Sequence, residues 1–415
     1  MEDVDRADPR WTVMVFMGAG DIEGDADLAP YLKKDIREME SVITKGGPKA
    51  PVNVFLEIHG LRGLDPVRQW VGVKDSQEPV TPASGEVDGK PILAFIDWAL
   101  SKVPPRPGDH TLLVLWGHAY RFAIGREETP TGVDAVDVGE FAAALRELQA
   151  RAQQQYEFEP GAMPRLDIVG FDACDISTLE LANQLQPFAR YLIGSQIGIP
   201  LPGWPYDTIL DRLSNPRDGR PMSPPDFGRF AVRKFCEEYA FKDFDGRTLP
   251  VSLTLLDLDK APEAFDAAEA LAGAIARACG EDAGELETVI EQFAASQTIE
   301  GKPFIDVADF CLNLSRWSLS ADVRIEAARL GNILIRPSLD AINPPKPEEG
   351  VRGSLIVEHG RNAHQTAKLH GVSLYAPHIL GEDYDWRASR FWYQKFDFTG
   401  ETFWCRLVHV LSEGN

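Results

Sequence analysis

Short apolar runs alternate with amphipathic stretches from the start of the chain to residue 258. The apolar runs have the length of buried strands and fall at 11–17, 52–58, 111–117, 166–171, 190–196 and 251–258, with a later one at 371–377. Apolar residues recur with helical spacing at 28–43, 91–102, 138–156, 176–187 and 224–240. This alternation predicts an α/β arrangement, with one mostly parallel sheet and helices on both faces.

The pattern changes after residue 258. Two Ala-rich amphipathic stretches, 261–279 and 321–335, predict helices, and a Pro-rich loop at 342–350 precedes a return to strand at 353–375. We therefore expect a core over 1–257, a helical insertion or subdomain over 258–350, and a segment over 351–415 that returns to the sheet, with 371–377 as one of its added strands. Polar stretches at 121–134 and 151–164 predict surface loops.

Charge and composition narrow the class of partner. The chain has 415 residues, 44% of them hydrophobic, and a formal net charge of −22. Such a surface repels nucleic acid and anionic membranes and favours basic partners. The apolar runs are far shorter than the ~20 residues of a membrane helix. The polar, acidic start "MEDVDRADPR" predicts no signal peptide, so we expect a cytoplasmic protein.

Cysteine usage points away from a disulfide framework. The five cysteines are widely spaced, odd in number and without a CxxC pair; they stand at positions 174, 236, 279, 311 and 405. This usage is typical of thiols in a reducing compartment and not of a zinc site. We expect four of the five to fill core space.

A glycine-rich turn, "FMGAGDIEGD" at 16–25, raises the alternative of a nucleotide-dependent enzyme. Glycines after a strand allow phosphate to approach a helix N-terminus. Here Asp21, Glu23 and Asp25 crowd the same turn, and three carboxylates would repel a pyrophosphate. The favoured interpretation is a plain turn at the end of a strand.

Two chemically active side chains follow apolar strands at their carboxyl ends. His118 follows 111–117 in "LLVLWGHAY", and Cys174 follows 166–171 in "IVGFDACDISTLELANQL". Ligands of open α/β sheets gather at this edge, and consecutive strands tend to be neighbours. A helix predicted to begin at the cysteine would favour its thiolate, and an imidazole beside a thiolate performs acyl transfer. His59 also ends a strand and is a rival base.

At these motifs the chain resembles the clostripain family of cysteine peptidases, in the caspase-like clan. Further matching segments are "WTVMVFMGAGD", "YLIGSQIGIPLPGWPYDTIL", "PFIDVADF" and "GVSLYAP". His118 stands 56 residues before Cys174, close to the ~50 residues that separate the two catalytic residues in caspases. The resemblance implies a caspase-like core and endopeptidase activity with a Cys–His dyad.

The resemblance also assigns roles to individual residues. Cys174 would be the nucleophile and His118 the general base, with the backbone N–H groups of Ala119 and Cys174 as the oxyanion hole. Asp172 would lie at the bottom of the pocket for the residue before the scissile bond and would select Arg or Lys. Ser195 and Trp204 would bind substrate. An alternative for Asp172 is an N-cap of the following helix.

The sequence departs from the family pattern in two places. A glycine-rich run commonly follows the histidine, where this chain has Ala119-Tyr120-Arg121, and a second acidic pocket residue is often found where this chain has Pro202. One carboxylate fewer leaves open a larger pocket with apolar walls.

Two further family properties bear on the expectations. Many members cut themselves, so Arg121, Arg126, Arg151 and Arg165 are either cleavage points or ordinary solvated arginines. Some relatives need calcium; no EF-hand spacing is present, so we expect no cofactor and no metal, with calcium left as an open alternative.

Together these observations predict a cytoplasmic cysteine endopeptidase that cuts after Arg or Lys. Its partner would be a protein or peptide with basic residues, and by analogy an intracellular effector protein activated by cleavage. The alternative is a catalytically inactive caspase-like scaffold that binds basic peptides.

Overall fold

The fold is taken from a computed structural model of the chain. The description covers residues 8–18, 26–43, 46–59, 65–80, 89–120, 123–129, 132–155, 165–216, 220–240, 243–244, 247–299, 304–335, 353–362 and 366–376, with Phe396, Thr402, Trp404 and Leu407. The glycine-rich turn considered above lies outside the described residues after Gly18.

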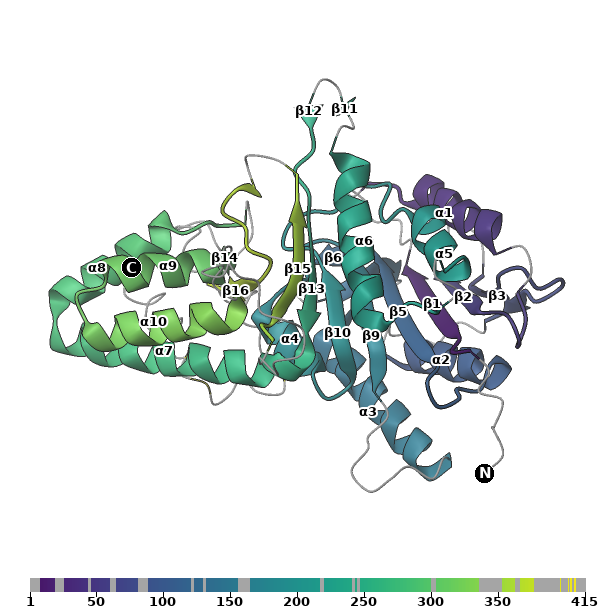
Figure 1. Cartoon of the computed structure of the whole chain (residues 1–415), viewed down its shortest axis with the longest axis horizontal. Coiled ribbons are helices and arrows are strands. Elements are labelled where there is room, and N and C mark those ends of the chain that lie inside the picture. Colours follow the sequence, from purple (N-terminus) through teal and green to yellow (C-terminus); the bar gives the residue numbers. More distant parts are fainter. Residues whose placement is uncertain are drawn as a thin grey trace.

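A twisted, mostly parallel sheet organises the larger part of the molecule (Figure 1). In the described residues its strand order is β15-β13-β10-β9-β5-β1-β2-β3-β4. Its strands are β1 (Trp11–Gly18), β2 (Val52–His59), β3 (Val67–Trp70), β4 (Glu78–Pro79), β5 (His110–Gly117), β9 (Leu166–Asp172), β10 (Ala189–Gly194), β13 (Ser252–Asp257) and β15 (Ile356–Arg361). The five central strands, β10 to β2, run parallel, and antiparallel strands close both edges.

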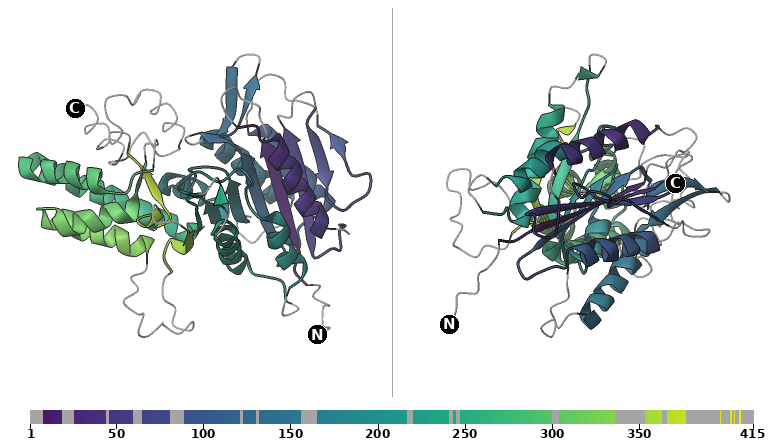
Figure 2. Two further views of the ribbon diagram at one scale, coloured as in Figure 1. Left: turned by 90° about the horizontal axis from the view of Figure 1, so that it is seen from above. Right: turned by 90° about the vertical axis from the view of Figure 1, so that its right-hand side faces the viewer.

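Helices cover both faces of this sheet, as Figure 2 shows edge-on. One face carries α1 (Ala29–Val42), α5 (Tyr206–Ser214) and α6 (Pro224–Tyr239); the other carries α2 (Lys90–Lys102), α3 (Val138–Gln155) and α4 (Leu179–Leu185). Strand β1 shows why both faces are apolar. Val13 and Val15 belong to the core under α1, α5 and α6, whereas Met14 and Phe16 belong to the opposite core. Successive side chains of a strand point to opposite faces, so a continuous apolar run supplies both layers.

Four helices form a separate layer beyond the β13–β15 edge (Figure 1). They are α7 (Ala261–Glu281), α8 (Ala283–Ala295), α9 (Val307–Trp317) and α10 (Ala321–Leu334), and a 3₁₀ turn η1 (Leu258–Lys260) leads into α7. This agrees with the helical C-terminal subdomain expected from the Ala-rich stretches. The boundaries drawn at 257 and 350 remain predictions.

The strand predicted at 371–377 does not join the main sheet, contrary to the expectation. The observed strand β16 (Ser373–Tyr375) pairs antiparallel with β14 (Phe304–Asp306) in a sheet of its own. The reason is that β15 already occupies the edge of β13, so that edge offers no open ladder to β16.

The predicted surface loop at 121–134 is also wrong in part. Strands β6 (Ala119–Tyr120), β7 (Ala123–Thr129) and β8 (Gly132–Asp137) form an antiparallel sheet directly after His118. The predicted loop at 151–164 begins later than expected, because α3 continues to Gln155; 156–164 lie outside the described residues. Strands β11 (Asp243–Phe244) and β12 (Arg247–Thr248) make a short hairpin. None of the described helices is both long and apolar enough to traverse a lipid bilayer.

Candidate active site

The order of the strands decides which histidine neighbours the cysteine. Strands β5 and β9 are adjacent and parallel, and Trp116 pairs with Asp172 in their register. His118 and Cys174 each follow two residues after this paired position, so both leave the sheet at the same level of the same rim. His59 ends β2, which β1 and β5 separate from β9. Its Nε2 lies 2.7 Å from Glu57 Oε1, and the order of the strands places His118, not His59, beside the strand of Cys174.

Cys174 lies in a tight turn, not at a helix N-terminus as the sequence suggested. Helix α4 begins at Leu179, five residues later, and its N-cap is Thr178, whose hydroxyl accepts a hydrogen bond from the Leu181 N–H. The prediction that the helix dipole favours the thiolate is therefore wrong for α4, since that effect fades within the first turn. The turn instead uses Asp175 in a left-handed conformation, with φ of 58°, which is uncommon outside glycine and frequent at functional sites.

The cysteine turn is held by the segment that follows β10. The backbone N–H groups of Ile176 and Ser177 both donate to the carbonyl of Ser195, at 2.8 and 2.9 Å. The Ile199 N–H donates to Cys174 Sγ at 3.3 Å, and the sulfur is half-buried. A turn fixed at both its backbone and its side chain keeps the thiol in one position, as a positioned nucleophile requires.

The ring of His118 is oriented by a backbone carbonyl. Its Nε2 lies 2.9 Å from the oxygen of Ala26, and the side chain is half-buried. A carbonyl only accepts, so in the neutral ring Nε2 carries the hydrogen and Nδ1 is the basic nitrogen. Ala26 comes from the segment between β1 and α1.

Asp172 is a buried carboxylate and does not cap a helix, so the N-cap alternative is wrong. Its Oδ2 accepts from the Trp204 N–H and from the Tyr206 hydroxyl, both at 3.0 Å. Within the described residues Oδ1 has no hydrogen-bond partner, although it is buried. Burial raises the pKa of Asp172 to about 6, against the lowering effect of these two hydrogen bonds. The carboxyl therefore carries its charge above that pH, inside a nearly solvent-free site.

The loop that carries Trp204 closes tightly over this carboxylate. Gly203 adopts a φ of +66°, and a Cβ at this position would lie 2.7 Å from Asp172 Oδ2. Both facts require glycine, because a side chain would be strained and would strike the carboxylate. The Gly-Trp-x-Tyr motif thus positions its backbone and Tyr206 around Asp172.

Trp204 and Ser195 lie deeper than the sequence suggested. The Trp204 ring is buried against Gly170 of β9 and stacks on Tyr206, with ring centroids 6.4 Å apart. The Ser195 hydroxyl is buried and donates to the carbonyl of Ile197, within its own turn. Both residues shape the site in this structure; direct contact with substrate remains a prediction for each.

Helix α1 brings a second buried carboxylate to the site, which the sequence reading missed. Asp35 is fully buried; its Oδ2 accepts from Trp116 Nε1 at 2.8 Å and its Oδ1 from Lys34 Nζ at 3.1 Å. A signal was present in the sequence. Leu32 and Met39 point into the core, and Asp35 stands between them at helical spacing, so a charged residue occupies a core-facing position.

Asp35 should make the stability of the protein fall as pH rises. Burial, and then the nearby charge of Asp172, raise the pKa of Asp35 to about 8, whereas the unfolded chain has a pKa of about 4. Between pH 4 and pH 8 the folded state therefore holds a proton that the unfolded state releases. The contribution of this proton to the free energy of unfolding is fully present below pH 4 and is lost as the pH rises to 8. We expect Asp35→Asn to raise the melting temperature relative to the parent by about 2–4 °C at pH 8.5 and by less at pH 5.

The matched control for this comparison is Glu40→Gln, an exposed carboxylate on the same helix. Thermal unfolding of all three proteins across pH 5 to 8.5 is the measurement. A difference between Asp35→Asn and the parent that stays constant with pH, or that shrinks as pH rises, would contradict the assignment.

Two arginines considered as self-cleavage points are engaged in the fold. Arg151 lies within α3 and pairs with Asp97 at 2.5 Å. Arg165 donates to the carbonyl of Ala189 at 3.0 Å and pairs with Asp259. Arg126 lies in β7, and Arg121 lies outside the described residues. Peptidases bind extended chain, so Arg151 and Arg165 fit the alternative of ordinary structural arginines.

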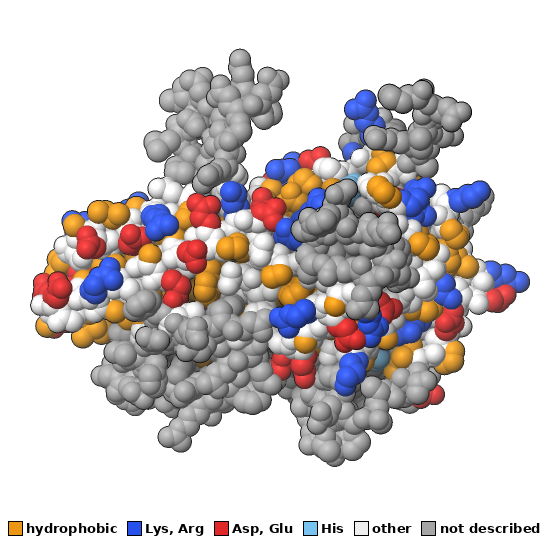
Figure 3. All heavy atoms as spheres, turned by 90° about the horizontal axis from the view of Figure 1, so that it is seen from below, with side chains coloured by type: hydrophobic (Ala, Val, Ile, Leu, Met, Phe, Trp, Pro, Cys, Tyr) orange, Lys and Arg blue, Asp and Glu red, His pale blue; other side chains and the backbone are white. Residues whose placement is uncertain are grey.

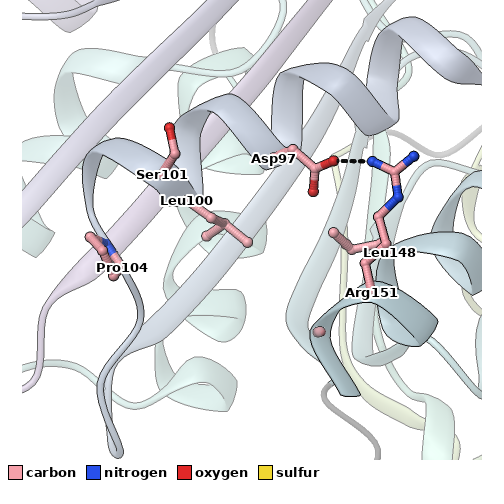
Figure 4. Close-up of a pocket in the computed structure, with 7 residues that line it drawn as sticks. Asp97, Leu100, Ser101, Pro104, Leu148 and Arg151 are labelled. Carbon is pink, nitrogen blue, oxygen red and sulfur yellow. Dashed lines mark hydrogen bonds and ion pairs between the residues drawn. The ribbon is translucent and has the colours of Figure 1, made fainter. Parts of the chain in front are cut away.

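A groove of about 550 Å³ lies between α2 and α3, away from His118, Cys174 and Asp172 (Figure 4). Asp97, Ser101 and Arg151 line it with apolar neighbours, and the Asp97–Arg151 pair spans it. Pro104, at its end, precedes β5, so the groove lies toward the amino-terminal edge of the sheet, opposite to His118 and Cys174. Among the described side chains, no cluster of three or more His, Cys, Asp or Glu is placed to hold a metal ion.

Comparison with known proteins settles the family. The profile of the clostripain family of peptidases matches residues 21–409. The chain belongs to the clostripain family. It is accordingly a cysteine peptidase with peptide substrates, and the resemblance seen in the sequence is confirmed. No curated protein matches the chain.

Solved structures of clostripain-type enzymes share the fold. A secreted C11 cysteine protease from Bacteroides thetaiotaomicron, in complex with an irreversible peptide inhibitor, is 18% identical with a TM-score of 0.57 over 94% of this chain and 99% of its own. An inactive zymogen C11 protease from Parabacteroides distasonis is 17% identical with a TM-score of 0.57 over 95% and 98%. At this identity the likeness confirms the predicted fold class.

Proposed function

We propose that this clostripain-family chain is an endopeptidase that uses Cys174 and His118 as a catalytic dyad and cuts after Arg or Lys. The observation that carries the proposal is the register of β5 and β9, in which Trp116 pairs with Asp172. Because His118 and Cys174 follow at equal distances, the imidazole and the thiol emerge from adjacent strands at one rim. The conformation of the cysteine turn supports the same assignment.

The chemistry follows from the orientation of the ring. With Nε2 donating to the Ala26 carbonyl, Nδ1 is the nitrogen that accepts the proton of Cys174. The thiolate attacks the scissile carbonyl, and the N–H groups of Cys174 and Ala119 hold the oxyanion. His118 then gives its proton to the leaving amine. Water attacks the acyl-enzyme with His118 as base, and the thiol returns to its starting state.

Asp172 supplies the selectivity for basic residues in this proposal. Its buried Oδ1 has no partner among the described residues, and an uncompensated buried charge is unfavourable. A substrate guanidinium or ammonium would supply the missing partner through a charge-assisted hydrogen bond. This supports cleavage after Arg or Lys even though Pro202 stands where relatives often have a second acidic residue.

The cellular location and the physiological substrate of the enzyme are also part of the proposal. We also propose that the enzyme is cytoplasmic and that its substrate is an intracellular effector protein activated by cleavage. The face seen in Figure 3 shows acidic and basic side chains interspersed with apolar ones. Charges of both signs are mixed on the part of this face that is coloured, which favours recognition by a pocket over recognition by one large acidic patch.

Hydrolysis of matched peptides tests the proposal. The peptides are identical except for the residue before the scissile bond, which is Arg, Lys, citrulline or Leu; citrulline has the shape of Arg without its charge. We expect kcat/KM for Arg and Lys to exceed that for citrulline by about tenfold or more, since a charge-assisted hydrogen bond contributes about 1.5–3 kcal/mol. Equal hydrolysis of Arg and citrulline peptides, or none of any, would contradict the proposal.

A further inference from the structure

The carboxylates around Asp172 already have a cation beside them. Lys34 Nζ lies 3.1 Å from Asp35 Oδ1 and 2.5 Å from Glu38 Oε1, and donates to the carbonyl of Pro202 at 3.3 Å. The Glu38 contact alone would be an ordinary i,i+4 pair of an exposed helix face. The other two contacts are different in kind, because Asp35 is fully buried and Pro202 belongs to the loop that follows β10.

That loop also covers the proposed specificity pocket. Pro202 precedes Gly203, whose Cα approaches Asp172 so closely that a Cβ would strike its carboxylate. Glu38 reaches the same loop, since its Oε2 accepts from the Tyr206 N–H at 3.2 Å. Lys34 and Glu38 thus both contact the segment whose Trp204 N–H and Tyr206 hydroxyl donate to Asp172.

Among the four charged or acidic side chains Lys34, Asp35, Glu38 and Asp172, that of Lys34 is the most exposed to solvent. The Lys34 side chain is 38% exposed and the Glu38 side chain 20%, whereas Asp35 and Asp172 are buried. The cation therefore stands at the accessible side of two buried carboxyl groups, and among the described residues Oδ1 of one of them, Asp172, has no hydrogen-bond partner.

We propose that Lys34 is a built-in counter-ion of the Asp172 pocket, with which the basic side chain of a substrate must compete. The inference rests on the proposed function and identifies Lys34 as a residue that sets specificity. In the absence of substrate its ammonium balances part of the charge of Glu38 and Asp172. A substrate Arg or Lys brings a second cation to the same carboxylates, so part of its attraction is cancelled by repulsion from Lys34. A neutral side chain meets no such repulsion.

The consequence is that removing Lys34 should sharpen the preference for basic residues. We expect Lys34→Gln to raise the ratio of kcat/KM for the Arg peptide to that for the citrulline peptide by about tenfold, the effect of one charge contact. Lys33→Gln is the matched control, because Lys33 is the preceding residue on the same helix and is exposed. Lys34→Arg keeps the cation and should leave the ratio near that of the parent.

The ratio of two substrates does not depend on how much of the enzyme is folded, so partial loss of a variant does not disturb the readout. Lys34→Met, which keeps an unbranched apolar stem, is the second variant and should raise the ratio like Lys34→Gln. A ratio in both variants that equals that of Lys33→Gln, or falls below it, would overturn the role of Lys34. If the parent hydrolyses none of the peptides, the proposed function itself fails; if it hydrolyses them and the ratio does not move, only the inference about Lys34 fails.

Discussion

Cys174→Ala is expected to lower kcat/KM for the Arg peptide by about 10⁴-fold or more, because the variant has no thiolate to form an acyl-enzyme. His118→Ala should lower kcat/KM for the same peptide by about 10²–10⁴-fold, the usual contribution of a general base. Initial rates with the fluorogenic Arg peptide measure both. Each variant keeps the strands that carry the site, since both residues lie in the turns that follow β5 and β9.

The matched control for the nucleophile is Cys279→Ala. Cys279 is a half-buried cysteine on α7, remote from the β5–β9 rim, and its replacement should leave kcat/KM within about twofold of the parent, as for a substitution away from the site. A Cys174→Ala protein that cleaves as fast as Cys279→Ala would refute the assigned mechanism.

Chemical labelling gives a readout of the same prediction that is independent of peptide hydrolysis. Burial raises the pKa of Cys236 to about 12 and that of Cys279 to about 11, and it raises the pKa of Cys311 as well. Thiols with such pKa values react slowly with alkylating agents near neutral pH. Brief treatment with iodoacetamide and peptide mass mapping should therefore find Cys174 modified before these three.

The second large effect is expected at Asp172. Asp172→Asn keeps an oxygen that accepts from the Trp204 N–H and the Tyr206 hydroxyl, but it removes the negative charge. We expect kcat/KM for the Arg peptide to fall by about 10²-fold, and that for the citrulline peptide to change little, because a charge-assisted contact of about 1.5–3 kcal/mol is lost only with the charged substrate.

The pH profile separates this role from a merely structural one. The pKa of Asp172 is about 6 in the folded protein, so the carboxylate is neutral below that pH and charged above it. The ratio of Arg to citrulline hydrolysis should rise through pH 6 in the parent and stay flat in Asp172→Asn. Asp211→Asn, an exposed site on α5, is the control and should keep the rise. A rise that persists in Asp172→Asn would place the selectivity elsewhere.

Much of the fold could be predicted because its determinants are local. Apolar runs and helical spacing placed all six strands predicted before residue 260 and the helices α1, α2, α3 and α6 to within a few residues. Helix α5 was missed because it is only nine residues long and begins within the Gly-Trp-x-Tyr motif, although its buried residues recur at helical spacing. The position of β16 was wrong, because its partner is chosen by which strand edge is already occupied, and a local pattern carries no information about that.

By itself, the sequence determined the fold class, the family motifs, and the two strand ends that carry His118 and Cys174, because these depend on residue types and spacing within single segments. Only the tertiary structure decided that His118, not His59, neighbours the strand of Cys174, since strand order is a property of the whole sheet. It also decided that Asp172 binds the Gly-Trp-x-Tyr segment and that Lys34 and Asp35 join the same site. Lys34 and Asp35 stand more than a hundred residues before Asp172, and the Gly-Trp-x-Tyr segment follows a different strand. Only long-range packing brings these groups together.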